Sequence, residues 1–225
     1  MKSRSILFCF LIVPFLSFAQ KDSLSLGDRY SDDQIYVSVS YSQFFDQPST
    51  ITKSNFSYSL SAGIMKDIIL NKSGTIAIAA GVGYGYDFFN HELKVAEIDN
   101  TTVFNSDITN SKNIFKTHNL EFPLEFRWRT STANKYNFWR IYTGIKLLYN
   151  LDNKFQYTDS NAIQFKYANV GSYNKLQYGL TISAGYDAFT MNVFYGLTPI
   201  FKEGFINGEV VDTKILKFGL IFYFL

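Results

Sequence analysis

The 225-residue sequence predicts an all-β fold, an eight-stranded antiparallel up-and-down transmembrane β-barrel. Eight segments carry an apolar residue at every second position, which is the period of a β-strand. After residue 19 no apolar run is long enough for a membrane helix, so a membrane-spanning chain would have to cross as strands. The last segment, 216–225, is an aromatic strand that suits the closing of a barrel wall.

The N-terminal segment predicts export. Lys2 and Arg4 precede an apolar run, and Ser17 and Ala19 supply the small residues of a cleavage site, so we expect residues 1–19 to be a secretory signal that is cleaved near Ala19. An uncleaved anchor helix is the alternative. The apolar run of about thirteen residues is short for a ~30 Å hydrocarbon core, which favours the cleaved signal.

The mature chain should contain a polar periplasmic lead-in segment, residues 20–33, and a barrel domain, residues 34–225. Cys9, the single cysteine, lies inside the signal, so we expect no disulfide in the mature protein. Removal of the signal leaves 19 Lys and Arg against 19 Asp and Glu. This balance, without any basic stripe, argues against a nucleic-acid partner.

The first three strand segments combine a large apolar face with a face of small residues. Segments 35–45 and 56–65 alternate aliphatic and aromatic residues with serines, and segment 76–88 alternates them with alanines and glycines. Small inward side chains suit the narrow interior of an eight-stranded barrel. The glycines of the third segment open no helix, so we interpret them as space for bulky interior side chains opposite rather than as a phosphate loop.

The fourth and fifth segments, 120–129 and 138–149, carry most of the inward charges. Large apolar residues alternate with Glu, Pro and Arg in the fourth segment, and with Arg, Tyr, Gly and Lys in the fifth. Charges inside a barrel are costly unless they are paired. We therefore expect a lumen charge network that consists of Glu121, Glu125, Arg127, Arg129, Arg140 and Lys146.

The last three segments repeat the alternation, and the connections between segments differ regularly in length. The strand segments are 176–186, 192–198 and 216–225. The longer connections are 46–54, 89–116, 150–174 and 202–213, and the shorter ones are 67–73, 130–137 and 187–190. Outer-membrane barrels have long external loops and short periplasmic turns, so we expect both termini to face the periplasm.

Two other architectures fit part of the pattern. A soluble barrel also has eight alternating strands, but its solvent face would carry many Lys and Glu, whereas the non-apolar face here is mainly Ser, Gly, Thr and Ala. A ten-stranded barrel would result if residues 93–115 formed a further strand pair. We interpret that stretch instead as strands three and four projecting above the membrane around a turn near Asp99 and Asn100.

The register of the fourth and fifth segments follows from the position of the turn between them. A turn centred within residues 131–136 places Trp128 opposite Trp139 and Glu121 opposite Lys146. The two outward indoles would then form an interfacial aromatic pair, and the two inward charges would neutralise each other.

The histidines offer little for catalysis. His91 lies in the long connection after the third segment, and His118 lies at the external rim of the fourth, where we expect it to meet solvent. A barrel lipase would need a serine, a histidine and a carboxylate on neighbouring outward positions, and no such spacing appears. No cluster has metal-ligand spacing either. We expect no catalytic, cofactor-binding or metal site.

The run from His118 to Leu124 contains Leu120-Glu121-Phe122-Pro123-Leu124, which resembles the Leu-Glu-aliphatic-Pro-Leu strand of PorT-like outer-membrane β-barrel proteins. The signal that ends in Ala19-Gln20 and the aromatic last strand also resemble that family. Phe122 replaces the usual Ile or Val, and Leu225 follows the aromatic residue that more often ends the chain. The resemblance implies an integral outer-membrane barrel, and some members of the family serve protein secretion.

These observations predict a structural or interaction protein of the outer membrane that acts through its external loops or its periplasmic rim. An eight-stranded wall is filled by its own side chains, so a paired plug fits better than a narrow channel, which stays an alternative together with a lipid-modifying barrel enzyme. The expected partners are outer-membrane lipid, lipopolysaccharide, the barrel-assembly machinery and an envelope protein.

Overall fold

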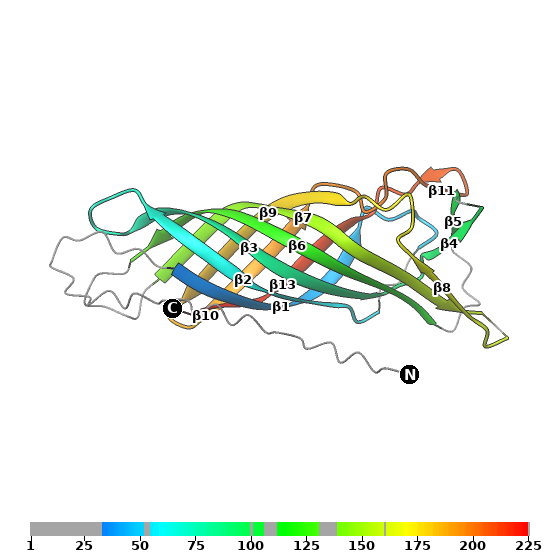
Figure 1. Cartoon of the computed structure of the whole chain (residues 1–225), viewed down its shortest axis with the longest axis horizontal. Helices are drawn as coiled ribbons and strands as arrows, with labels where there is room; N and C mark the ends of the chain where they lie inside the picture. The colour runs from blue at the N-terminus through cyan, green and yellow to red at the C-terminus, as the bar shows by residue number, and fades with distance from the viewer. Residues whose placement is uncertain are drawn as a thin grey trace, which may run out of the picture.

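The computed structural model of the chain is shown in Figure 1. The structure describes residues 33–51, 55–99, 101–105, 112–130, 139–159 and 161–224. The predicted signal and all but the last residue of the predicted lead-in segment lie outside this range, so their predictions stay untested. No helix in the described part of the chain is long and apolar enough to cross a membrane.

Eight antiparallel strands form a closed barrel, as the sequence predicts (Figure 1). They are β1 (Asp33–Phe45), β2 (Tyr58–Ile69), β3 (Ile76–Asn90), β6 (Lys112–Arg129), β7 (Trp139–Thr158), β9 (Leu176–Tyr186), β10 (Phe189–Gly196) and β13 (Lys214–Phe224). Each strand pairs with the next along the chain, and β13 pairs with β1, so every barrel strand has two neighbours. Closure leaves no open sheet edge within the ring of eight, which is the condition for strands in lipid.

In the described part of the chain, five short strands lie outside the ring of eight. β4 (Lys94–Ile98) pairs with β5 (Thr101–Asn105), β11 (Phe205–Ile206) pairs with β12 (Glu209–Val210), and β8 (Gln164–Ala168) extends the sheet along the outer half of β7. The ten-stranded alternative is therefore wrong. The interpretation of residues 93–115 is confirmed only in part. β6 begins at Lys112 and so prolongs strand four, and the chain turns at Asp99, but β4 and β5 form a separate hairpin; Asn100 lies outside the described residues.

The two ends of the barrel differ. Short turns join β2 to β3 and β9 to β10 at one end, where β6 ends and β7 begins, and the short hairpins and long connections gather at the other (Figure 1). We call these the turn end and the external end, following the loop-length rule for outer-membrane barrels. β2 continues to Ile69, so Asp67 lies in a strand rather than in the predicted turn, and β6 and β7 extend farther toward the external end than predicted.

The two faces of the wall follow the predicted parity. Large apolar residues at alternate positions of every barrel strand are exposed on the outside, and polar residues between them are buried inside. In β9 the side chain of Ile182 is 53% exposed and that of Thr181 is 3% exposed. An apolar outer surface on a closed barrel is what contact with lipid requires.

The register between β6 and β7 differs from the prediction by two residues. Trp128 pairs with Ile141 and Glu121 with Leu148, so neither predicted pair is directly opposite. A shift of two residues keeps each side chain on its predicted face, because the period of a strand is two.

Pro123 makes no bulge in this ladder. The irregularity lies between His118 and Asn119, where β7 contributes one extra residue, and Pro123 pairs in register with Lys146. In the ladder between β3 and β6, by contrast, the pairing is interrupted between Ala80–Leu124 and Gly83–Glu121, where Pro123 has no amide hydrogen to donate.

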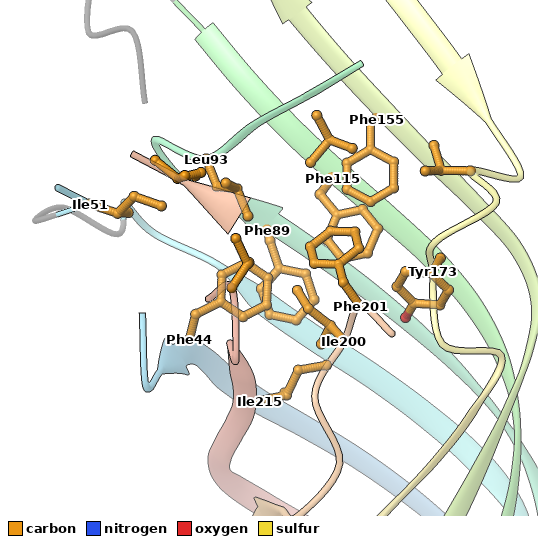
Figure 2. Packing of buried hydrophobic residues seen from close by; sticks show 14 of the residues in the cluster. Phe44, Ile51, Phe89, Leu93, Phe115, Phe155, Tyr173, Ile200, Phe201 and Ile215 are labelled. Atoms are coloured by element: carbon orange, nitrogen blue, oxygen red, sulfur yellow. The ribbon is translucent and has the colours of Figure 1, made fainter. Parts of the chain in front are cut away.

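Apolar side chains close the external end of the interior (Figure 2). Phe44, Phe89, Phe115 and Phe155 come from β1, β3, β6 and β7, and their rings stack in a row with centroid distances of 4.2, 5.6 and 4.2 Å. Tyr173 and residues of the later loops pack against this aromatic cluster. A second, smaller apolar group around Met65 lies nearer the turn end. Buried charged and polar residues fill the rest of the interior.

Candidate functional site

The candidate site is the charged interior of the barrel, and its part nearer the turn end is built around Arg127. Its guanidinium is fully buried, with Nη1 2.7 Å from Asp67 Oδ1 and Nη2 2.9 Å from Glu125 Oε2. Nη1 also donates to Gln34 Oε1 at 2.8 Å. The ring of Tyr142 lies 4.6 Å from the guanidinium carbon and completes the enclosure. Paired charges, hydrogen bonds and a cation–π contact together offset the cost of burying this cation.

Arg129 and Arg140 are directly opposite each other in the ladder and both point inward. Arg129 Nη1 lies 2.9 Å from Asp67 Oδ2, and its Nε donates to the carbonyl of Gly74 at 2.9 Å. Arg140 Nη2 donates to the carbonyl of Asp187 at 2.7 Å. Asp67 therefore bridges Arg127 and Arg129. The backbone carbonyls of Gly74 and Asp187, each in a turn, accept the further hydrogen bonds of Arg129 and Arg140.

Glu121 and Lys146 form the middle of the interior. They are not directly opposite in the ladder, yet Lys146 Nζ lies 2.9 Å from Glu121 Oε2, because a diagonal neighbour is still within reach of long side chains. The hydroxyl of Tyr36 donates to the same carboxylate at 3.3 Å. At Gly85 a Cβ would lie 2.5 Å from Glu121 Oε1, and at Gly83 it would collide with the phenol of Tyr36. These two glycines make room for bulky interior side chains, as predicted.

A further ion pair lies closer to the external end. Lys217 Nζ is 2.6 Å from Asp87 Oδ1, and the other carboxylate oxygen accepts hydrogen bonds from Thr117 and Asn119 at 3.2 and 3.0 Å. Asn150 continues the network by donating to Asn119 Oδ1 at 2.9 Å. The polar interior thus extends toward the external end as far as the aromatic cluster.

All six residues of the predicted lumen charge network are buried inside the barrel. The structure brings Glu125 to Arg127 and Glu121 to Lys146, whereas Arg129 forms an ion pair with Asp67 and Arg140 donates to the carbonyl of Asp187. Asp67, which the sequence analysis missed, supplies a further acid for Arg127 and Arg129, and the interior also holds a second missed acid, Asp87, paired with Lys217. Asp67 follows Met65 at an inward position between the outward Lys66 and Ile68, and this parity was the signal that could have found it.

Trp128 and Trp139 both point outward at the turn end, but they do not form the predicted pair. Trp139 pairs with Tyr186 of β9, and the two rings lie 5.2 Å apart. Trp128 lies between Ile76 and Ile141. Both indoles still occupy the height at which amphipathic rings meet the membrane interface.

The two histidines lie in different surroundings. His118 does not meet only solvent: it is half-buried on the outer face, and its Nδ1 is hydrogen-bonded to the hydroxyl of Tyr84. His91 is buried beside the rings of Phe44 and Phe115, and burial lowers its pKa to about 3. Both ring nitrogens of His91 are unpartnered within the described part of the chain. Within those residues no group of three or more His, Cys, Asp or Glu could hold a metal ion.

The loops at the external end fold into a structured layer, the external cap, formed by the hairpins β4–β5 and β11–β12, strand β8 and their connections. Ser49 joins the first loop to β12, because its amide and hydroxyl donate to Glu209 at 2.7 and 2.6 Å, and these hydrogen bonds lower the pKa of Glu209. Phe104 of β5 packs edge-on against Phe201 at 4.8 Å. These contacts connect loops that are far apart in the sequence.

A pocket of about 510 Å³ opens in the cap between β5 and the start of β11. Val103, Ser172, Glu203 and Phe205 are among its lining residues. At Gly204 a Cβ would lie 2.7 Å from the Phe104 ring, so only glycine permits this approach of the two segments. The pocket therefore depends on the way the cap is folded.

Comparisons with known proteins agree with this architecture. Residues 18–202 match the outer membrane protein beta-barrel domain family. No curated protein sequence matches the chain. Among solved structures, the attachment invasion locus protein Ail of Yersinia pestis is similar at 12% identity and a TM-score of 0.28, over 85% of this chain and 99% of that one. A structure described under asymmetric conductivity of engineered proteins has 8% identity and a TM-score of 0.22, over 87% and 100% of the two chains.

The structural likenesses are distant, so the fold rests on the strand pairing and the family on the sequence match. A closed barrel of eight strands, an apolar outer surface and a family match over most of the chain point to the same compartment. The chain belongs to the outer membrane protein β-barrel domain family and is an integral protein of the outer membrane.

Proposed function

We propose that this protein is a non-enzymatic interaction protein of the outer membrane that binds an envelope protein partner through its external cap. The observation that carries the proposal is the contrast between a filled interior and an exposed apolar surface on the cap. Passage through the barrel would need a continuous polar space, whereas binding needs an accessible, ordered surface.

The filled interior argues against a channel. Arg127, Arg129, Glu121 and Tyr142 are among the largest fully buried side chains, and each occupies the middle or turn-end part of the lumen. The aromatic cluster lies above them. An ion would have to separate several buried ion pairs and displace stacked rings, and each broken pair costs several kcal/mol.

The cap offers apolar side chains around its pocket. Phe205 is 66% exposed and Val103 is 42% exposed, and both line the pocket. Val210, the ladder partner of Phe205, is also exposed. Apolar residues that gather on an otherwise polar external surface mark a binding site for another protein. An apolar side chain of the partner would enter the pocket between β5 and β11.

A role in protein secretion is a narrower form of this proposal. It is supported by the resemblance of Leu120-Glu121-Phe122-Pro123-Leu124 to PorT-like barrels and by the aromatic last strand. In that case the partner at the cap would be a component or a cargo of a secretion pathway. Assembly of the barrel by the barrel-assembly machinery is part of the same proposal.

Site-specific cross-linking in intact cells tests the proposed surface. A photo-reactive residue at Val103 should give a discrete cross-linked protein, whereas the same residue at the lipid-facing Ile182 should not. Phe205→Asp should abolish the product, and Ile163→Asp, a matched change of an exposed apolar residue elsewhere in the cap, should leave it intact. An identical pattern of products from Val103 and Ile182 would contradict the proposal.

A further inference from the structure

Three lysines gather on the outer face of the barrel where β6, β7 and β8 extend toward the external end. Lys116 lies directly opposite Lys154, and Lys166 pairs with Gln156, two residues farther along β7. Their neighbours Phe115 and Phe155 are buried, so parity places the lysines on the outward side. We call Lys116, Lys154 and Lys166 the lysine face.

The lysine face lies just above the lipid-facing band. From Trp139 to Tyr149, β7 spans about 25 Å along the barrel axis, at ~3.3 Å per residue and a tilt of ~40°, which matches the apolar band of an outer-membrane barrel. Lys154 lies about 12 Å farther along the axis by the same geometry. This is the height of the sugars and phosphates of the outer leaflet, and flexible lysine side chains can reach down toward the membrane.

The positive charge of this face is not balanced by the protein. Lys154 Nζ lies 2.8 Å from Asp152 Oδ2, and Lys116 Nζ lies 5.8 Å from the ring centroid of Phe88. Within the described residues, no carboxylate lies within ion-pair distance of Lys116 or Lys166. Like charges that face each other across a ladder are destabilising, so an anion between them would stabilise the pair.

Another external lysine shows the contrast. Lys214 Nζ is 2.9 Å from Asp46 Oδ2 and 2.9 Å from Asp212 Oδ2, so two carboxylates neutralise it. The lysine face has one carboxylate for three ammonium groups. The difference indicates that its counter-ions come from outside the chain.

The surface between these lysines is hollowed. A pocket of about 270 Å³ is lined by all three lysines together with Ile114, Tyr167 and other residues of β6, β7 and β8. Tyr167 pairs with Phe155 and faces inward with it, so the groups presented outward here are mainly the three ammonium groups, which suit the phosphate esters of a sugar.

We propose that the lysine face binds the phosphorylated sugars of an outer-leaflet glycolipid, with phosphate oxygens between Lys116, Lys154 and Lys166. The membrane is the source of the ligand, because the face points sideways along the leaflet at the height of its phosphates. This site is separate from the pocket in the cap, so it does not depend on the proposed protein partner.

Native mass spectrometry of the refolded mature protein in detergent tests the assignment, with diphosphoryl lipid A and its dephosphorylated form as probes. Lys116→Gln/Lys166→Gln should weaken binding of diphosphoryl lipid A about tenfold or more, because two charge-assisted hydrogen bonds to phosphate are lost. The control Lys72→Gln/Lys202→Gln removes the same charge from the turn end and the cap and should leave the affinity unchanged. The heat-dependent gel shift checks that each variant folds, and the single Lys166→Gln replaces the double variant if it does not.

Three results would overturn the assignment. One is an unchanged affinity in the lysine-face variant, and another is equal binding of dephosphorylated lipid A. The third is displacement of lipid A by inorganic phosphate at a similar concentration, which would make the face a general anion site. Cross-linking at Val103 should be unaffected by Lys116→Gln/Lys166→Gln. Failure of the lysine-face proposal can therefore be distinguished from failure of the proposal that the cap binds a protein partner.

Discussion

Asp67→Asn should destabilise the barrel by about 3 kcal/mol, because this carboxylate bridges two buried guanidinium groups. Its oxygens lie 2.7 Å from Arg127 Nη1 and 2.9 Å from Arg129 Nη1, and all three side chains are at most 1% exposed. Asparagine keeps the shape of the side chain. It removes the negative charge, however, and turns an NH₂ group toward one of the two donors.

The magnitude follows from the partners that remain. Removing one member of a buried ion pair costs about 3–5 kcal/mol. Arg127 keeps Glu125 at 2.9 Å and Gln34 at 2.8 Å, and Arg129 keeps the carbonyl of Gly74, so we expect the lower end of that range. In a double-mutant cycle with Arg129→Gln, the two changes should be less than additive by about 1–3 kcal/mol, since they remove the two ends of one interaction.

Urea unfolding of the protein refolded into vesicles, followed by tryptophan fluorescence, gives the free energies of unfolding. Asp212→Asn is the matched control, because Asp212 forms an ion pair with Lys214 at the surface, where such pairs contribute less than about 1 kcal/mol. If Asp67→Asn cost no more than Asp212→Asn, the buried network would not support the barrel and the reasoning would be refuted.

Three further predictions use the same unfolding assay or the efficiency of refolding. Glu121→Lys should impair folding and Lys146→Glu should restore part of the loss, because the two groups form a buried ion pair; purely additive damage would assign Glu121 another partner. Ile182→Arg on the lipid face should cost about 2–4 kcal/mol, whereas Thr181→Ser on the inner face should be nearly silent, and equal tolerance would contradict the assigned faces. Burial lowers the pKa of His91 to about 3, so the unfolded chain binds one more proton below pH ~6.5; stability should fall by ~1.4 kcal/mol per pH unit from there toward pH 3, and His91→Leu should remove this slope.

The barrel could be predicted from the sequence because the alternation of apolar and polar residues is visible within each single strand. In β9 every second residue from Leu176 to Tyr186 is apolar, and the strand has the bounds that the alternation predicts. Parity also placed Glu121, Arg127 and Lys146 inside the wall. Local alternation fixes the face of each side chain, whatever the rest of the chain does.

The register of β6 and β7 could not be predicted in the same way. The alternation of faces is compatible with any shift of the register by an even number of residues. Which register forms depends on the conformation of the connection between the strands, and the alternation contains no information about it. The observed shift of two residues separates Trp128 from Trp139. It leaves Glu121 within reach of Lys146, because these long side chains meet diagonally.

The partners of the charges were the least predictable part of the site. Asp67 was assigned to a turn, since a polar residue near Asn71 and Gly74 resembles a loop when strand length is unknown. Asp87 and Lys217 are 130 residues apart and meet only when the barrel closes. The external cap depends on contacts between distant loops, such as that of Phe104 with Phe201, which no local pattern contains.

The central claim is that the interior is closed by paired charges and stacked rings, so that the protein acts through its outer surfaces. Planar-bilayer recording of the refolded mature protein tests this most directly. We predict a current at the level of a protein-free bilayer for the wild type. We predict stepwise conductance for a variant that combines Arg127→Ala with Phe115→Ala, which opens the network and the aromatic cluster together. Regular stepwise conductance of the wild-type protein would contradict the account.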